Sequence, residues 1–261
     1  MSVPAAPRSP ATVPTGILAW DPHVPPSDAG RGKSVSFVYP AFNEEENIAE
    51  AVRRAVEAAA LVGLDEFEVI VVDDGSADGT WSLLENIARD EPRLRPIRHD
   101  QNRGYAAALR TGFTAARFPL VFYSDSDNQF DIREIRYLLP LAERFDIVTG
   151  FRIYRFDHLT RLVLSWGFNL LVRILFRIPV RDIDCAFKIF RREIFDKIEI
   201  ESQRFFVDTE ILAKAKALGL TMTEIGVRHY PRIAGQSTVR PIHILYTLRE
   251  LAKIWGRIYL K

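Results

Sequence analysis

The pattern of apolar and polar positions changes at Ser34, where short apolar runs begin to alternate with longer stretches of helical spacing. The apolar runs predict strands at 34–39, 67–73, 94–98, 120–124 and 146–149. Several of these runs are apolar throughout, which is typical of strands buried on both faces of a parallel sheet. The stretches between them predict helices at about 45–61, 78–89, 104–117 and 131–143. This alternation predicts an α/β fold with a doubly wound, mainly parallel sheet flanked by helices.

The segments on either side of this alternation differ from it. Residues 1–33 contain seven of the fifteen prolines, so they cannot bury enough apolar surface to offset their ordering entropy and predict a disordered arm. After residue 150 the pattern predicts helices at 158–177 and 207–218 and a strand at 221–228, and then an amphipathic helix at 241–261. We therefore expect an arm at 1–33, a domain at 34–240 that divides at residue 150, and a C-terminal amphipathic helix.

Composition and charge narrow the classes of protein. The 35 basic and 34 acidic side chains leave a net charge of +1, which argues against a general nucleic-acid binder. The single cysteine, Cys185, suits a reducing compartment, and the first thirty residues show no apolar secretory signal, so we expect a cytoplasmic protein. The most apolar stretch, 162–172, lies between Arg161 and Arg173 and is shorter than the roughly 20 residues of a membrane span. A soluble or peripheral protein is therefore expected.

Polar residues follow three of the expected strands, at 40–44, 73–80 and 124–129. In a doubly wound sheet, ligands bind beyond the carboxyl ends of the strands. Asp125 and Asp127 follow a buried strand with Gln129 two positions on, and such oxygen ligands suit Mg²⁺ or Mn²⁺, although Asp, Ser and Asn also favour ordinary turns. Asp74 could bind a nucleoside or form a tight turn, and Phe42 could stack on a base or pack. No G-x-G-x-x-G follows the first strand, which disfavours a dinucleotide fold.

Together, the three segments resemble the family 2 glycosyltransferases, whose nucleotide-binding domain has the GT-A fold. Proline, an aromatic residue and Asn-Glu at 40–44 are similar to the family's first motif, and the D-D-G-S-x-D-G-T run at 73–80 is similar to its second. Asp125-Ser126-Asp127 is similar to its D-x-D motif. The resemblance covers about 34–240, with a nucleotide-sugar half at 34–150 and an acceptor half at 151–240, and it implies metal-dependent transfer from a nucleotide diphosphate sugar.

Within the family, further segments resemble the polyprenyl-phosphate sugar transferases, such as the dolichol-phosphate mannosyltransferases. These segments are 102–104, 125–130, 150–152, 161–165, 230–232 and 235–237. The resemblance implies a nucleoside site formed by Pro40, Phe42, Glu44, Val72 and Asp74. It implies a metal site formed by Asp125, Asp127 and Gln129, with Ser126 touching the donor. It also places Arg152 and Arg232 against phosphates, with Arg152 and Arg161 at the acceptor phosphate.

Two positions depart from the pattern of these transferases. Trp166 follows Ser165 at a position where these transferases often have a basic residue. Thr238 follows Ser237 at a position where they often have a lysine. Both departures concern the phosphate acceptor, and neither touches the donor site. The Q-x-x-R-W motif of processive synthases is absent, which favours transfer of a single sugar.

Asp208 and Glu210 open an expected helix and have two interpretations. Either could be a general base that activates an acceptor hydroxyl, with Asp208 the stronger candidate, or both could be acids placed favourably near a helix N-terminus. We expect an inverting displacement in which Asp127, Arg152 and, for a hydroxyl acceptor, Asp208 are the catalytic residues. A lipid phosphate is already anionic and needs positioning more than deprotonation.

The apolar and basic segments at 158–177 and 241–261 could lie in the headgroup plane of a membrane, or they could pack into the core or a dimer interface. We expect a polyprenyl phosphate as acceptor at the cytoplasmic face of the membrane. A hydroxyl acceptor such as a glycan, and a non-catalytic nucleotide-sugar-binding protein, are the alternatives. A sugar nucleotidyltransferase is disfavoured because the first strand is not followed by a glycine-rich loop.

Overall fold

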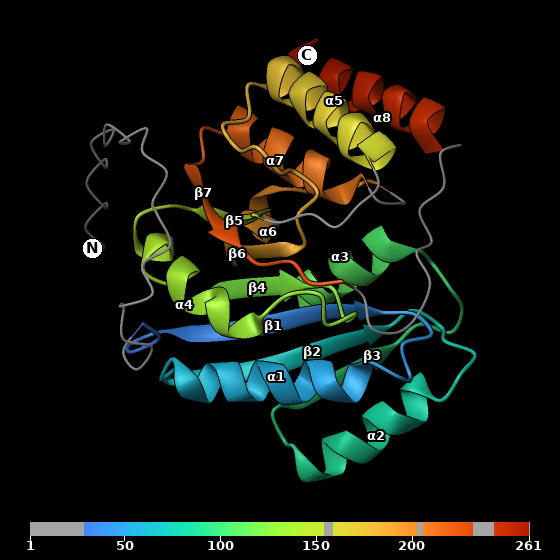
Figure 1. Ribbon diagram of the computed structural model, residues 1–261, viewed down its shortest axis with the longest axis vertical. Helices are drawn as coiled ribbons and strands as arrows, with labels where there is room; N and C mark the ends of the chain where they lie inside the picture. Colours follow the sequence, from blue (N-terminus) through green and yellow to red (C-terminus); the bar gives the residue numbers. More distant parts are fainter. Residues whose placement is uncertain (1–28, 154–158, 203–205, 232–242, 261) are drawn as a thin grey trace, which may run out of the picture.

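A seven-stranded sheet in the order β3-β2-β1-β4-β6-β5-β7 forms the centre of the computed structural model (Figure 1). The structure describes residues 29–153, 159–202, 206–231 and 243–260, with backbone alone at 159–164, 243–248 and 250. The strands are β1 (Ser34–Ala41), β2 (Glu66–Asp73), β3 (Leu94–Arg98), β4 (Leu120–Ser124), β5 (Ile147–Arg152), β6 (Phe187–Arg191) and β7 (Met222–Val227). Residues 1–28 of the expected arm lie outside the described residues.

Helices flank this sheet, as the alternating pattern predicts. They are α1 (Ile48–Leu61), α2 (Thr80–Asp90), α3 (Tyr105–Ala115), α4 (Ile135–Leu138), α5 (Leu159–Phe176), α6 (Ile194–Lys197), α7 (Val207–Ala217) and α8 (His243–Tyr259). The sheet is mainly parallel, because β3, β2, β1 and β4 pair in parallel and β5 pairs in parallel with β7. The predicted fold class is confirmed.

Strand β6 runs against its neighbours and is missing from the sequence prediction. It pairs antiparallel with both β4 and β5, so its amino end lies at the edge where the other strands end. Its sequence, F-K-I-F-R, interrupts the apolar run with Lys188, and this hides the strand from a search for continuous apolar residues. The sheet therefore brings the segment before β6 to the same edge as the three polar motifs.

The single helix predicted at 131–143 is also wrong. The structure has two 3-10 turns, η2 (Ile132–Glu134) and η3 (Leu141–Glu143), on either side of the short α4. Pro140 lies between α4 and η3 and lacks the N–H group that a continuing helix would use.

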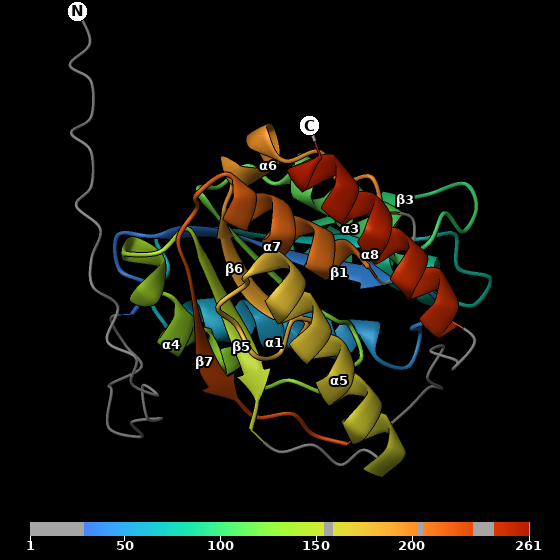
Figure 2. The ribbon, with the colours of Figure 1, turned by 90° about the horizontal axis from the view of Figure 1, so that it is seen from above.

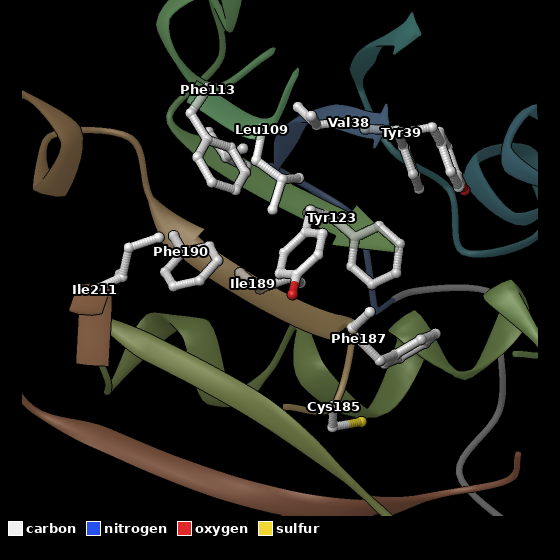
Figure 3. Packing of buried hydrophobic residues seen from close by; sticks show 14 of the residues in the cluster. Val38, Tyr39, Leu109, Phe113, Tyr123, Cys185, Phe187, Ile189, Phe190 and Ile211 are labelled. Atoms are coloured by element: carbon white, nitrogen blue, oxygen red, sulfur yellow. The ribbon is translucent and has the colours of Figure 1, made fainter. Parts of the chain in front are cut away.

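The core is rich in aromatic side chains where α3 meets β4 and β6 (Figure 3). The ring of Phe113 lies 5.7 Å from that of Tyr123 and 5.8 Å from that of Phe190, in edge-to-face contacts. All three side chains are buried, and each such ring contributes about 1.5–3 kcal/mol through burial. This packing joins the strands of the two halves of the sheet.

Helices α5, α7 and α8 contact one another and form a layer beyond β6 and β7 (Figures 1 and 2). Val172 and Phe176 of α5 and Leu251 and Ile254 of α8 are buried, while Lys253 of α8 is exposed. The rings of Phe176 and Tyr259 lie 6.4 Å apart. Within the described parts of the chain, we find no helix with both the length and the apolar character that a bilayer span requires.

Candidate active site

The loops after β1 and β2 hold each other through side-chain hydrogen bonds to backbone. The Asn43 amide donates to Ser76 Oγ at 2.9 Å, and the Ala77 amide donates to Asn43 Oδ1 at 2.9 Å. The Glu44 amide donates to Thr80 Oγ1 at 2.9 Å. Asn43 has a φ of 55°, a left-handed conformation that asparagine tolerates better than most residues. These hydrogen bonds therefore form a frame that holds the two loops together at the carboxyl edge of the sheet.

Asp74 and Gly75 join this frame to the loop at 99–104. The Asp74 carboxylate accepts hydrogen bonds from the amides of Arg103 at 2.9 Å and Gly104 at 2.7 Å, and it lies 2.6 Å from His99 Nδ1. Gly75 has a φ of 72°, and a Cβ there would lie 2.5 Å from the backbone carbon of Gln101. Only glycine permits both this conformation and this close approach.

The residues predicted to hold the nucleoside come together at the ends of β1 and β2. Phe42 is 42% exposed, while Glu44 is half-buried and accepts a hydrogen bond from Asn47. Val72 is fully buried opposite Pro40, so only its backbone could reach a nucleoside. The structure thus places the five predicted residues along one edge, and their contacts with a nucleoside stay predictions.

The acidic pair follows β4 at the same edge. Between the two acids, the buried Ser126 donates its hydroxyl to the Pro40 carbonyl at 2.9 Å, which fixes this loop against β1. Asp125 Oδ1 accepts a hydrogen bond from the Tyr105 hydroxyl at 2.9 Å, and Asp127 Oδ1 accepts one from the Gln129 amide at 3.1 Å. Asp125 is therefore held from α3, and Asp127 is held from within its own loop.

Gln129 connects the acidic loop to the segment after β7. Its side-chain nitrogen donates to the Tyr230 carbonyl at 2.9 Å, and the Tyr230 amide donates to its backbone carbonyl at 2.8 Å. Next to it, Phe130 forms a β-bridge with His229, and their rings lie 4.9 Å apart. The predicted phosphate ligand Arg232 comes two positions after Tyr230 and lies outside the described residues.

The residues at this edge fit a hard divalent cation. Carboxylate and amide oxygens are the ligands that Mg²⁺ and Mn²⁺ prefer. The Gln129 amide uses its nitrogen toward Tyr230, so its oxygen is the atom that would serve as a ligand. In the described part of the chain, no group of three or more His, Cys, Asp or Glu side chains is arranged to hold a metal. A cation held by Asp125, Asp127 and Gln129 would have to complete its shell with water and substrate phosphates.

On the other side of the edge, Arg152 at the end of β5 forms a two-pronged ion pair with Asp182. Its Nε lies 2.7 Å from Asp182 Oδ2 and its second nitrogen 2.6 Å from Oδ1. Burial opposes the charge of Arg152, but the hydrogen bonds to Asp182 outweigh that cost and raise the pKa of the guanidinium. A phosphate contact by Arg152 would share the guanidinium with Asp182. Arg161 lies in α5, and its side chain is outside the described residues.

Asp208, in the first turn of α7, is buried and paired. Its carboxylate lies 2.7 Å from the ammonium of the fully buried Lys188 and accepts a hydrogen bond from the Tyr123 hydroxyl at 2.7 Å. Burial, together with the negative charge of Asp208, raises the pKa of Tyr123 well above 10. The surroundings of Asp208 favour its structural interpretation over that of a base, which must reach a substrate.

The segment between α5 and β6 holds functional candidates that sequence reasoning missed. The Ile183 amide donates to the buried Asn169 of α5 at 3.0 Å, which fixes Asp182 and Asp184 on either side. Asp184 is exposed at the surface. Desolvation by the protein around its carboxyl, followed by the negative charge of Asp208, raises the pKa of this group to about 7. The available signal was the charge-rich run R-D-I-D-C-A-F-K directly before an apolar strand.

A mainly parallel sheet with polar loops and an acidic pair at its carboxyl edge defines the GT-A class of nucleotide-sugar-binding folds. The family model of glycosyl transferase family 2 matches residues 36–199. The chain belongs to this family.

Two relatives have names that indicate their activity. The chain is 34% identical over 218 residues to the glycosyltransferase AglD of Haloferax volcanii, a match that covers 80% of this chain and 35% of AglD. It is 33% identical over 220 residues to the undecaprenyl-phosphate 4-deoxy-4-formamido-L-arabinose transferase of Pseudomonas fluorescens, covering 83% of this chain and 63% of that protein. The chain thus spans about one third and just under two thirds of the lengths of these two relatives.

Among solved structures, glucosyl-3-phosphoglycerate synthase of Mycobacterium tuberculosis, in complex with Mn²⁺, UDP and glucosyl-3-phosphoglycerate, matches with a TM-score of 0.65. The match covers 88% of this chain and 81% of that chain at 21% identity. At this identity the likeness shows a shared fold.

Proposed function

We propose that this chain transfers a single sugar, with inversion, from a nucleotide diphosphate sugar to a polyprenyl phosphate at a membrane surface, with the help of Mg²⁺ or Mn²⁺. The observation that carries the proposal is the acidic pair Asp125 and Asp127, fixed at the end of β4 by Ser126 and Tyr105. The relative named as an undecaprenyl-phosphate sugar transferase supports the polyprenyl acceptor, and the solved structure with Mn²⁺ and UDP supports the donor and the cation.

On the donor side, the chain's own residues would bind and orient the nucleotide. Phe42 is exposed at the end of β1, where its ring could stack on a base. Asp125, Asp127 and Gln129 would hold the cation. A bound cation supplies positive charge for the diphosphate that leaves. The frame formed by Asn43 and Ser76 keeps this edge in place before substrate arrives, which favours transition-state stabilisation without reorganisation.

On the acceptor side, the geometry favours a phosphate over a hydroxyl. A phosphate acceptor carries its own negative charge and needs a cationic residue to orient it, and Arg152 is fixed at the end of β5 by Asp182. Asp208, the residue first considered as a base, is turned into the core toward Lys188 and Tyr123. A nucleophile that needs no base agrees with this arrangement.

The outer face of α5 supports contact with a lipid surface. Trp166 and Ile174 are 66% and 68% exposed, and Leu170 between them is 38% exposed. Their spacing of four residues places them on one side of the helix, and Arg173 and Arg177 beside them are exposed. An apolar stripe next to cationic side chains is the pattern of a helix that lies in the headgroup region.

The proposed reaction is tested with the purified chain, undecaprenyl phosphate in detergent, and UDP-, GDP- and dTDP-sugars, with Mn²⁺ or with EDTA. We expect sugar transfer from one of these donors, loss of transfer in EDTA and recovery when Mn²⁺ is restored. Transfer that is unaffected by EDTA would contradict the cation, and absence of transfer with every donor would contradict the acceptor.

The membrane contact is tested by flotation with vesicles that contain anionic lipid. The double variant Trp166→Ser/Ile174→Ser is expected to lose most binding, because both apolar anchors are removed. The matched control is Leu218→Ser at the end of α7, an exposed leucine (55%) outside α5 and α8, which is expected to float like the unmodified chain. Equal flotation of all three proteins would contradict a role for α5.

One observation favours a second acceptor class. Asp184 is exposed at the acceptor side, and its pKa near 7 is suitable for a general base that activates a hydroxyl. If the acceptor is a hydroxyl, the transfer rate should rise with pH through about 7, and Asp184→Asn should abolish that rise. With a lipid-phosphate acceptor, the same substitution is expected to leave the pH profile near 7 unchanged.

A further inference from the structure

A line of hydrogen-bonded side chains crosses the core of the acceptor half. It begins at Lys188 of β6, whose ammonium lies 2.7 Å from Asp208 of α7. The line ends at Tyr123 of β4, whose hydroxyl donates a hydrogen bond to Asp208. Tyr105, at the start of α3, makes a separate contact: its hydroxyl donates a hydrogen bond to Asp125 Oδ1 at 2.9 Å. Tyr105 thus holds a carboxylate of the candidate cation site.

The groups in this line are set in the core. Lys188 is fully buried, Tyr123 is fully buried and Asp208 is 5% exposed. Tyr123 lies in the aromatic cluster between α3, β4 and β6, with its hydroxyl at the edge of that cluster (Figure 3). Buried polar groups of this kind are costly to rearrange, because each lost partner leaves a donor or acceptor unsatisfied. The line is therefore a rigid support.

The proton count of the two tyrosines shows which carboxylate each one holds. The carboxylate of Asp208 accepts hydrogen bonds, so Tyr123 donates its single proton to it. The Tyr105 hydroxyl donates its single proton to Asp125. Burial, followed by the negative charges of Asp125 and Asp208, raises the pKa of Tyr105, so the hydroxyl keeps this proton and restricts the orientation of Asp125.

We propose that Tyr105 is a positioning residue for the cation ligand Asp125. The inference rests on the proposed cation-dependent function and deepens it. A carboxylate that is held by a hydrogen bond from a neighbouring helix presents one orientation to an ion, and loss of such outer partners typically weakens metal affinity about 10- to 100-fold.

Tyr105→Phe tests the inference with Mn²⁺ alone as the probe. Binding is measured from the electron paramagnetic resonance signal of free Mn²⁺ in titrations of the full chain. We expect Tyr105→Phe to raise the Kd for Mn²⁺ about 10-fold or more. Tyr123→Phe removes a hydroxyl that is bonded to Asp208, so it should leave the Kd within about twofold. A Kd unchanged by Tyr105→Phe would overturn the inference and would leave the proposed sugar transfer standing.

The matched control is Tyr39→Phe. Tyr39 is 1% exposed in β1, and its buried hydroxyl has no hydrogen-bond partner among the described residues. Its removal deletes the same group without breaking a contact, so the Kd should stay within about twofold. The melting temperature of each variant is recorded, because a merely structural role for Tyr105 would lower it and leave the Kd unchanged.

Asp208→Asn is a control for a change in stability. Asparagine keeps the size of the side chain but places a neutral amide beside Lys188 and Tyr123, so we expect lower stability with a Kd for Mn²⁺ within about twofold. A rise in Kd equal to that of Tyr105→Phe would show that the loss of affinity follows stability, and it would overturn the inference. Sugar transfer that fails in the unmodified chain despite normal Mn²⁺ binding would count against the proposed function alone.

Discussion

The two halves of the sheet are held at their shared edge by different chemistry. In the nucleotide half, loops such as those of Asn43 and Asp74 are fixed by hydrogen bonds between side chains and backbone amides. In the acceptor half, the pairs Arg152–Asp182 and Lys188–Asp208 bring opposite charges together in places with little solvent. A buried ion pair offsets the cost of desolvation only while both partners are present, whereas the loops of the nucleotide half distribute their support over several hydrogen bonds to backbone amides.

This difference predicts whether a substitution in each half mainly lowers activity or mainly lowers stability. Removal of a carboxylate from the acidic pair should affect chemistry far more than folding. Asp127 Oδ1 accepts a hydrogen bond from the Gln129 amide in its own loop, and asparagine keeps an oxygen for that bond. Removal of one charge from the acceptor half should affect folding first. Each prediction below compares one half with the other.

The largest effect is expected for Asp127→Asn. Loss of a charged cation ligand should reduce sugar transfer on the order of 10³-fold, as deletions of single electrostatic groups do in other enzymes. The melting temperature should change little. Transfer rates and Mn²⁺ binding are measured beside Asp90→Asn, an exposed acid at the end of α2, which should behave like the unmodified chain. If Asp127→Asn lowered sugar transfer only modestly, the expected contrast between an acidic pair needed for activity and ion pairs needed for folding would be lost.

Lys188→Met should cost about 3 kcal/mol of unfolding free energy, because it leaves Asp208 charged and buried without its partner. Denaturant unfolding measures the loss. The comparison variant is Arg53→Met, whose guanidinium pairs with Glu50 on the surface of α1 at 54% exposure, and it should cost much less because solvent screens the pair. Similar costs for both variants would mean that burial does not set the strength of these pairs.

Gly75→Ala tests the frame of the nucleotide half. An added Cβ would meet the backbone at Gln101 and would also force alanine into a left-handed conformation, so we expect a loss of about 2 kcal/mol. Gly32→Ala separates the two causes, since Gly32 has the same φ of 72° and open space around it. It should cost only about 1 kcal/mol. Equal costs for the two variants would show that the close approach to Gln101 is unimportant.

The smallest effect concerns Glu134, which lies in η2 and accepts the amide of Arg228 beyond β7 at 2.8 Å. Burial raises the pKa of Glu134 from 4.5 to about 7, so the folded chain holds a proton that the unfolded chain releases. Stability from this group is therefore full below pH 4.5 and declines as pH rises through 7, by about 1 kcal/mol between pH 6 and 8. Thermal unfolding against pH should show this decline, and Glu134→Gln should remove it.

The same contrast explains what the sequence could predict. Asp125, Asp127 and Gln129 follow one another after an apolar strand, so their grouping can be seen without a fold. Asp182 and Arg152 are 30 residues apart, and Lys188 and Asp208 are 20 apart, so neither pair can be recognised before the strands are placed. Asp208 was noticed because it opens a helix, but only the fold shows that its carboxylate is buried beside Lys188. Strand β6 was missed because Lys188 breaks its apolar pattern.

The reversed strand β6 also has a consequence for how such a domain could be recombined. In the described sheet, β3, β2, β1 and β4 join β6, β5 and β7 through one ladder of five residue pairs, from Leu120 opposite Arg191 to Ser124 opposite Phe187. A chimaera joined between β4 and β6 would have to re-form the main-chain hydrogen bonds of this short ladder alone. It would still have to inherit the facing pair Tyr123 and Lys188, because a graft that lacks either one would remove a partner of the buried Asp208.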